Sequence, residues 1–330
     1  MPHDTPEKRF LDGIDAILRS VAGASLDVHF PRNDEFGNPR LARFLLERGR
    51  LPFIEDEIKP WLYRGWLIPY VQLCENHREI SPRYDYVLRT LEAGCLLDEP
   101  IPYRWFVGEF DPRTRPGLKM LEELIRHVEY KSGSWNGMRE FCEWLGFGLG
   151  VTTEPSKLDA DVQQYLYRNF NLQPLLLNPS DYLGQLLTES SYGKRNAFYP
   201  TPVHVSFFMN EMIRGDEKRD RRAQSVMDPA VGTGRMLLVA SNYSLRLFGQ
   251  DIDYLCCLVC KINLALYAPW FYIPEGFFES EENEQKFIVP QPDEKPVTDS
   301  CAAEKPVNKQ AKKYTTEIIQ PSLFDRENFL

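Results

Sequence analysis

The sequence has no long apolar run. None approaches the roughly 18 apolar residues in a row that a membrane helix requires. The N-terminal stretch MPHDTPEKRF is mixed in charge, and no apolar core of a signal peptide accompanies it. We therefore expect no membrane contact and a cytoplasmic protein.

Cysteine is sparse, and the spacing of the cysteines argues against both a disulfide framework and a zinc site. The chain has 7 cysteines, an odd number with irregular spacing, so a disulfide framework is not expected. The only cluster is CCLVC, Cys256–Cys260. A zinc site requires a second pair of ligands, and no second pair has a matching spacing. We expect no metal, and we interpret the cluster as small buried residues on one helix.

The chain also lacks an excess of basic residues. With 39 Lys and Arg against 48 Asp and Glu, its formal net charge is −9. Contacts to phosphates depend on local Lys and Arg. The balance therefore disfavours strong non-specific DNA binding, and any DNA contact requires a local basic patch.

Apolar residues, 43% of the chain, are sufficient for a sizeable core. Residues 1–178 are predicted to be mainly helical, because apolar residues recur at i, i+3 and i+4 among charges. Residues 179–280 alternate between helix and strand, which indicates a parallel sheet with covering helices. Residues 281–330 are rich in Pro, Glu, Lys and Gln and are predicted to be a flexible tail.

The α/β pattern can be followed segment by segment. DYLGQLLTES is predicted to be a helix with Asp181 near its N-terminus, and a loop containing FYPTP leads into an amphipathic helix. SVMDPAV is predicted to be a short buried strand and RLFGQDID a second strand. GTGRMLLVASNY is predicted to form a turn and helix after the first strand, and YLCCLVCKINLALY a helix after the second.

A glycine turn follows the first strand, where such folds bind nucleotides. Gly232 and Gly234 allow the backbone to approach a ligand closely, and Asp228 precedes them. Asp251 and Asp253 follow the second strand about 20 residues later, where an acid can accept hydrogen bonds from ribose hydroxyls. A dinucleotide is disfavoured, because Leu237 stands where GxGxxG has its third glycine.

Each of these pieces also has a purely structural interpretation. The turn is compatible with a plain strand–helix corner, FYPTP with a rigid loop packed on the core, and Asp251 with a helix cap. Their combination within one stretch is what favours a ligand site.

Three motifs in order, FYPTP, DPAVGTG and GQDID followed by CKINLALY, resemble the γ-type adenine-N6 DNA methyltransferases. These include the modification subunits of type I restriction systems. The resemblance covers about residues 181–267 and implies a partial Rossmann-like sheet that binds S-adenosylmethionine, with the acid holding the ribose. Carried over by position, the cofactor-binding residues are Phe198, Tyr199, Thr201, Pro202, Asp228, Pro229, Ala230, Gly232, Thr233, Gly234, Asp251 and Asp253. One extra residue, Pro200, interrupts the loop motif.

The catalytic motif of that family, of the form NPPF or DPPY, is missing. The sequence has no Pro-Pro dipeptide. LLNPSDY lies before the cofactor loop and is interpreted as a helix-start turn. YAPWFY lacks the Asn or Asp, and Trp270, Phe271 and Tyr272 are predicted to be a third strand. The catalytic residues are therefore unknown, and about three strands are indicated, fewer than the family's complete sheet has.

The ending QPSLFD resembles the short motif by which proteins bind the bacterial sliding clamp. Leu323 and Phe324 would fill apolar pockets, Gln320 would fix the register, and the flexible segment before them would set the reach. The alternatives are a chance match and a segment that packs on its own domain.

The resemblance leaves two hypotheses. The first is a DNA methyltransferase of the adenine-N6 type that binds S-adenosylmethionine, associated with restriction–modification or a mobile element, with base-side residues supplied by this chain or a partner subunit. The second is a catalytically inactive pseudo-methyltransferase that serves as a binding or assembly module. An RNA or protein methyltransferase is disfavoured, because FYPTP lies upstream of the turn.

Overall fold

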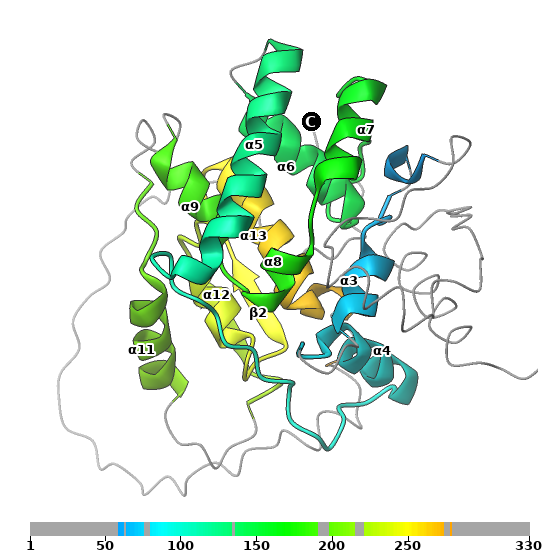
Figure 1. The fold of residues 1–330 in the computed structure, drawn as a ribbon. Coiled ribbons are helices and arrows are strands. Elements are labelled where there is room, and N and C mark those ends of the chain that lie inside the picture. The colour runs from blue at the N-terminus through cyan, green and yellow to red at the C-terminus, as the bar shows by residue number, and fades with distance from the viewer. Residues whose placement is uncertain are drawn as a thin grey trace, which may run out of the picture.

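The structure is a computed structural model that describes residues 59–62, 64–75, 80–133, 136–190, 198–214, 221–273 and 278 (Figure 1). The tail and its motif at Gln320, Leu323 and Phe324 lie outside the described residues. None of the described helices is long and apolar enough to cross a membrane.

The described part of residues 59–178 is mainly helical. α5 illustrates why: Leu121, Leu124, Ile125 and Val128 are buried along one face, and the helix ends at Gly133 with φ 61°. The elements are η1 (Pro60–Leu62), α3 (Ile68–Glu75), α4 (Arg83–Ala93), η2 (Pro112–Thr114), α5 (Arg115–Ser132), α6 (Gly137–Gly148), α7 (Ala160–Asn169) and α8 (Gln173–Leu177).

The elements after α8 follow the predicted order. Asp181 is the N-cap of α9 and accepts a hydrogen bond from Gly184 N, and Asp253 caps α13 in the same way through Cys256 N. These elements are α9 (Tyr182–Glu189), α11 (Val203–Arg214), β1 (Ser225–Asp228), α12 (Arg235–Ala240), β2 (Arg246–Gly249), α13 (Tyr254–Tyr267) and η3 (Pro269–Tyr272).

β1 and β2 form a parallel pair, with Ser225 opposite Arg246 and Asp228 opposite Gly249. The described residues contain no further sheet strand. The prediction that β1 is buried is wrong, because Ser225 and Met227 are exposed. Within the described part of the chain β1 pairs with β2 alone, so its other edge has no described partner. The described sheet is thus a small parallel pair rather than a complete Rossmann-like sheet.

The predicted third strand is also wrong. Residues 269–272 form the 3-10 helix η3, with Pro269 at its first position. Proline fixes φ for such a turn and cannot donate to a strand ladder. Trp270 is nonetheless buried, and its indole Nε1 donates to Ser241 O at 3.1 Å. Trp270 therefore packs in the core without forming a strand.

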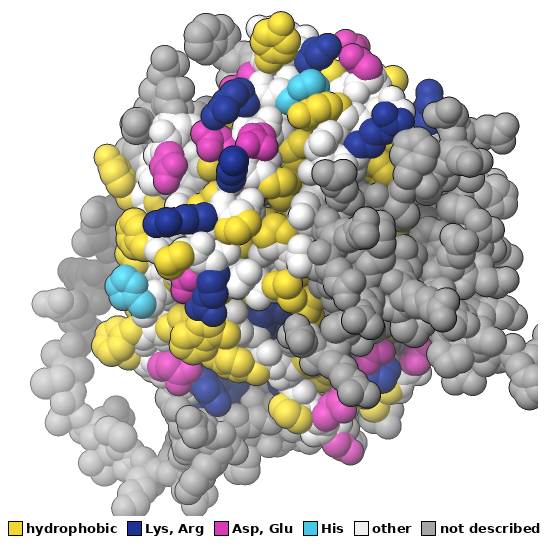
Figure 2. Space-filling model, in the orientation of Figure 1, with side chains coloured by type: hydrophobic (Ala, Val, Ile, Leu, Met, Phe, Trp, Pro, Cys, Tyr) yellow, Lys and Arg dark blue, Asp and Glu magenta, His cyan; other side chains and the backbone are white. Residues whose placement is uncertain are grey.

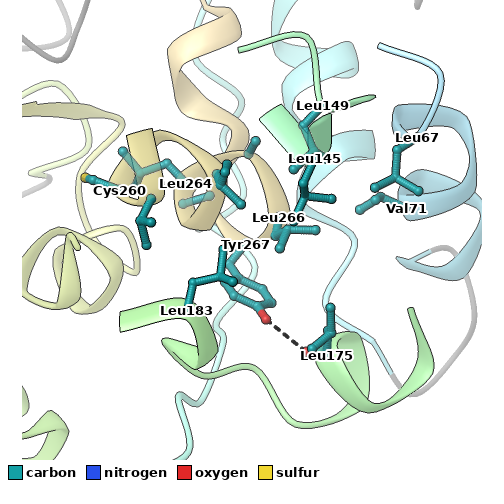
Figure 3. Packing of buried hydrophobic residues seen from close by; sticks show 14 of the residues in the cluster. Leu67, Val71, Leu145, Leu149, Leu175, Leu183, Cys260, Leu264, Leu266 and Tyr267 are labelled. Carbon is teal, nitrogen blue, oxygen red and sulfur yellow. Dashed lines mark hydrogen bonds between the residues drawn. The ribbon is translucent and has the colours of Figure 1, made fainter. Parts of the chain in front are cut away.

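One hydrophobic cluster extends across residue 178 and joins the helical region to the α/β elements. Figure 3 shows Leu67 and Val71 of α3, Leu145 of α6 and Leu264 of α13 within it. The Tyr267 hydroxyl donates to Leu175 O at 3.2 Å across the same junction. The described residues share this core on both sides of the predicted domain boundary.

Buried arginines reinforce the junction. Arg83 of α4 donates to Ser241 Oγ, Asn242 Oδ1 and Tyr267 O at 2.5–2.9 Å. Arg104 forms a 2.6 Å ion pair with Glu75, and both side chains are almost fully buried. Because buried charges need partners, Arg83 fixes α4 against the ends of α12 and α13, and Arg104 fixes its own loop against α3.

Candidate functional site

A pocket of about 490 Å³ opens where the carboxyl ends of β1 and β2 meet. Two backbone hydrogen bonds hold these ends together: Gln250 N donates to Asp228 O at 3.0 Å, and Val231 N to Gln250 O at 2.9 Å. The lining residues are Phe198, Tyr199, Pro200, Thr201, Asp228, Ala230, Val231, Gly232, Thr233, Arg235, Met236, Asp251, Ile252, Asp253 and Cys256.

The glycine turn requires both of its glycines. Gly232 has φ 51° and Gly234 φ 91°, a region that favours glycine. A Cβ on Gly234 would lie 2.6 Å from Cys260 Sγ, so α13 packs directly against the turn. Gly232 lines the pocket, whereas Gly234 serves the packing of the turn on α13.

Asp251 connects the loop that follows β1 to the loop that follows β2. Its Oδ2 accepts from Gly232 N and its Oδ1 from Asp253 N, each at 2.9 Å. A carboxylate oxygen can accept more than one hydrogen bond. The carboxylate is thus oriented by backbone donors and retains acceptor capacity toward the pocket.

Asp228 contributes a second carboxylate at the end of β1. Its Oδ1 accepts from Ala230 N at 3.1 Å. Partial burial raises the pKa of Asp228, the Ala230 hydrogen bond opposes this effect, and the charge of Asp251 raises the pKa further. A cation in the pocket would therefore stabilise the charged form of Asp228.

The loop of residues 198–202 closes over the glycine turn. A Cβ on Gly232 would lie 3.1 Å from Phe198 Cε2, so the aromatic ring covers the turn closely. The loop is fixed at Thr201, whose carbonyl accepts from Arg235 Nη1 at 3.3 Å. Tyr199 is 85% exposed at the pocket, so its ring is available for contact with a ligand.

Beneath the turn lies a buried polar hub centred on Asp181. Its carboxylate accepts from Gly184 N, Thr233 Oγ1, Arg235 Nε and Asn263 Nδ2 at 2.6–2.9 Å. Asn263 also donates to Thr233 O at 2.9 Å. One carboxylate thereby joins the start of α9, the glycine turn, α12 and α13.

Sequence reasoning brought together most of this site. Of the residues predicted to bind the cofactor, all but Pro202, Pro229 and Gly234 line the pocket. It missed the lining residues Arg235, Met236 and Cys256, which lie outside the three motifs, and also Ile252, which lies within GQDID. For Arg235 a signal existed, because a charged residue on the first turn of a largely apolar helix requires a partner.

The cysteines of α13 are buried and free. Burial raises the pKa of Cys256, and the carboxylates of Asp253 and Asp251 raise it further, so this thiol is neutral near pH 7. Among the described residues, no group of three or more His, Cys, Asp or Glu could hold a metal ion.

Charged side chains of both signs are mixed on the face of the molecule that Figure 2 shows. Figure 2 shows Lys and Arg side chains interspersed with Asp and Glu. Apolar side chains lie at the left of this view, where α11 lies in Figure 1. On α11 itself, Phe208, Met209, Met212 and Ile213 are exposed.

Comparison with known proteins gave one result. Residues 181–269 match the family model of the N-6 DNA methylases. No curated protein and no solved structure matched the chain. The matched segment runs from the N-cap of α9 to the first residue of η3 and contains every residue that lines the pocket. Residues 181–269 are therefore similar to the N-6 DNA methylases, and this similarity covers the pocket but less than half of the chain.

Proposed function

We propose that the pocket binds S-adenosylmethionine and that the chain takes part in adenine-N6 methylation of DNA. One observation carries the proposal. The loop of residues 198–202, the glycine turn and Asp251 lie far apart in the sequence and line the same pocket. The match of the segment to the N-6 DNA methylases supports the same conclusion.

The chemistry of the lining residues fits this cofactor. Asp251 offers acceptors to a ribose diol, and Asp228 and Asp253 add negative charge for a ligand that carries a sulfonium and an ammonium group. Phe198 and Ile252 supply apolar surface for an adenine ring. The pocket volume is within the range of about 300–1,000 Å³ that is usual for small-molecule sites.

When bound, S-adenosylmethionine would supply the methyl group, and the chain's own residues would orient it. Asp251 would fix the ribose, and Phe198 and Tyr199 would limit access of water from the loop side. Transfer also requires acceptors that hold the target amine in line. The sequence has no Pro-Pro motif to provide them, so we propose that a partner subunit supplies the base-side residues.

A second function, a pseudo-methyltransferase that acts as a binding or assembly module, is favoured by a different observation. β1 exposes Ser225 and Met227 at an edge that is unpaired among the described residues. Such an edge is an association surface. In this case the pocket would retain its ligand without transfer by this chain.

One experiment separates the two functions. The purified full-length chain is incubated with S-adenosylmethionine labelled on the methyl group and with adenine-containing duplex DNA, and both bound cofactor and N6-methyladenine are measured. Binding with transfer by the chain alone supports the enzyme and removes the need for a partner subunit. Binding without transfer fits either the module or an enzyme that its partner completes, and the same assay with a co-purified partner subunit separates these two. Absence of cofactor binding overturns the proposed cofactor pocket.

Two further partners belong to this proposal. DNA is the substrate that the enzyme hypothesis requires, and a restriction–modification or mobile-element setting in the cytoplasm is its expected context. The motif at Gln320, Leu323 and Phe324 would bring the chain to a sliding clamp. This docking would place the methylase domain near newly made DNA.

A further inference from the structure

The pocket is strongly asymmetric in charge. Three carboxylates line it, those of Asp228, Asp251 and Asp253. Among the described residues that line it, Arg235 is the only cation. A ligand in this pocket therefore contacts mainly acidic side chains. An anionic group of that ligand is favoured at one place, beside Arg235.

The guanidinium of Arg235 is held in a fixed orientation. Its Nε donates to Asp181 Oδ2 at 2.7 Å, and its Nη1 donates to Thr201 O at 3.3 Å. The side chain is only 6% exposed. Because the planar group is fixed on two sides, its remaining donors are preorganised rather than free to rotate.

The Nη2 atom of Arg235 donates no hydrogen bond to any residue that the structure describes. This nitrogen is not among the buried side-chain atoms that lack a partner, so water or a ligand can reach its donors. Since Arg235 lines the pocket, an acceptor that occupies the pocket can satisfy this nitrogen.

Nearby acids do not remove the need for such an acceptor. Asp181 shares its charge among four donors. Glu109 is 3.8 Å from Nη1 and also accepts from Val203 N at 3.4 Å, both long contacts. Neither acid contacts Nη2, and a carboxylate of the ligand would form a charge-assisted hydrogen bond there.

We propose that Arg235 binds the carboxylate of the amino-acid end of S-adenosylmethionine and thereby selects ligands that carry this group. The inference rests on the proposed cofactor and assigns a role to a residue that the motifs did not mark. Asp181 is a positioning residue in this arrangement, because it holds the Nε side of the guanidinium.

The test compares ligands with and without the carboxylate. S-adenosylmethionine, its decarboxylated analogue and 5′-methylthioadenosine are titrated calorimetrically into the full-length chain and into Arg235→Gln. We expect the unaltered chain to favour S-adenosylmethionine over the decarboxylated analogue by roughly tenfold to a hundredfold, as for one charge-assisted hydrogen bond. In Arg235→Gln this preference should vanish, because only the carboxylate-bearing ligand loses a contact.

Two variants serve as controls. Arg235→Gln leaves the buried Asp181 without its counter-ion and is prone to unfold. The double variant Asp181→Asn with Arg235→Gln removes both charges and should show the same loss of preference in a folded chain. Lys261→Gln removes a cation of α13 that does not line the pocket, and it should retain the preference.

The outcomes are distinct. Equal weakening of all three ligands by Arg235→Gln overturns the inference and means that Arg235 acts through the loop at Thr201. Retention of the carboxylate preference in both Arg235 variants also overturns it. If the unaltered chain binds none of the three ligands, both the proposed function and the role of Arg235 are overturned.

Discussion

Gly234 occupies a backbone position that side chains rarely adopt, and it is also the point where α13 touches the turn. Any other residue would add a Cβ at this position. That Cβ would strain the left-handed backbone and would lie 2.6 Å from Cys260 Sγ. The glycines of the motif thus serve two purposes. Gly232 leaves room for the Phe198 ring and the pocket, whereas Gly234 allows the turn to pack on the helix behind it.

We expect Gly234→Ala to destabilise the chain by about 2–4 kcal/mol, from a left-handed backbone and an overpacked contact. Gly94→Ala is the matched control, because Gly94 has φ 65° but no atom within 4 Å of a new Cβ. It should cost only about 1–2 kcal/mol. Urea unfolding of both variants measures the difference. Equal losses would show that contact with Cys260 is unimportant.

The raised pKa of Asp228 makes ligand affinity depend on pH. A cationic ligand favours the carboxylate, so affinity should fall as the pH decreases through the raised pKa. Asp228→Asn cannot titrate at this position and should bind with a flatter pH profile. Titrations of S-adenosylmethionine across the acidic range measure both profiles, and identical pH profiles would rule out Asp228 as the group responsible.

The elements that could be predicted from sequence are those with local signals. α9 and α13 begin at aspartates that cap them, and the apolar period of α13 matches the helix that forms. The sequence predicts a strand at Trp270, Phe271 and Tyr272, because bulky aromatic residues favour strands. Pro269 and the absence of a described strand partner produce η3 instead. Local propensity carries no information about whether a neighbouring strand exists.

In the pocket too, features with a local sequence signal could be predicted, whereas contacts between distant residues could not. Motif positions at Asp228, Gly232 and Asp251 were predictable because the backbone of a parallel pair brings its carboxyl ends together. The hub at Asp181 was predicted only as a helix cap. Its contacts with Arg235 and Asn263 span more than 50 residues of sequence, and such distant contacts leave no periodic signal.

Helices α3 and α4 are joined to the methylase segment by buried charge. We expect Glu75→Ala to destabilise the chain by about 3–5 kcal/mol, because Arg104 would remain buried without its partner. Glu143→Ala breaks a surface i, i+4 pair with Arg139 and should cost no more than about 0.5 kcal/mol. Chemical denaturation compares the two. A small effect of Glu75→Ala would mean that water reaches Arg104.

In the molecule as a whole, the segment that matches the N-6 DNA methylases is joined to a helical region through one core. β1 has no second strand partner among the described residues, and α11 exposes an apolar face. The chain's acidic net charge also argues that DNA contacts are confined to a patch or shared with a partner. Both features are consistent with a protein that works in an assembly.

The proposed docking to a sliding clamp is tested at the C-terminal tail of the full-length chain. Deletion of Gln320–Leu330 should abolish co-purification with a sliding clamp, because the motif and its apolar residues are lost. The double variant Leu323→Ala with Phe324→Ala should do the same at full length. The melting temperature should be unchanged in both. A lower melting temperature would show that the tail packs on the fold.

The central claim is that the pocket between the loop, the turn and Asp251 binds S-adenosylmethionine. The most direct measurement is a calorimetric titration of this cofactor into the full-length chain, into Asp251→Ala and into Glu154→Ala, a control at an exposed acid outside the pocket. We expect micromolar binding that Asp251→Ala weakens by roughly tenfold or more and that Glu154→Ala leaves unchanged. No binding by the unaltered chain, or equal binding by Asp251→Ala, would contradict this account of the site.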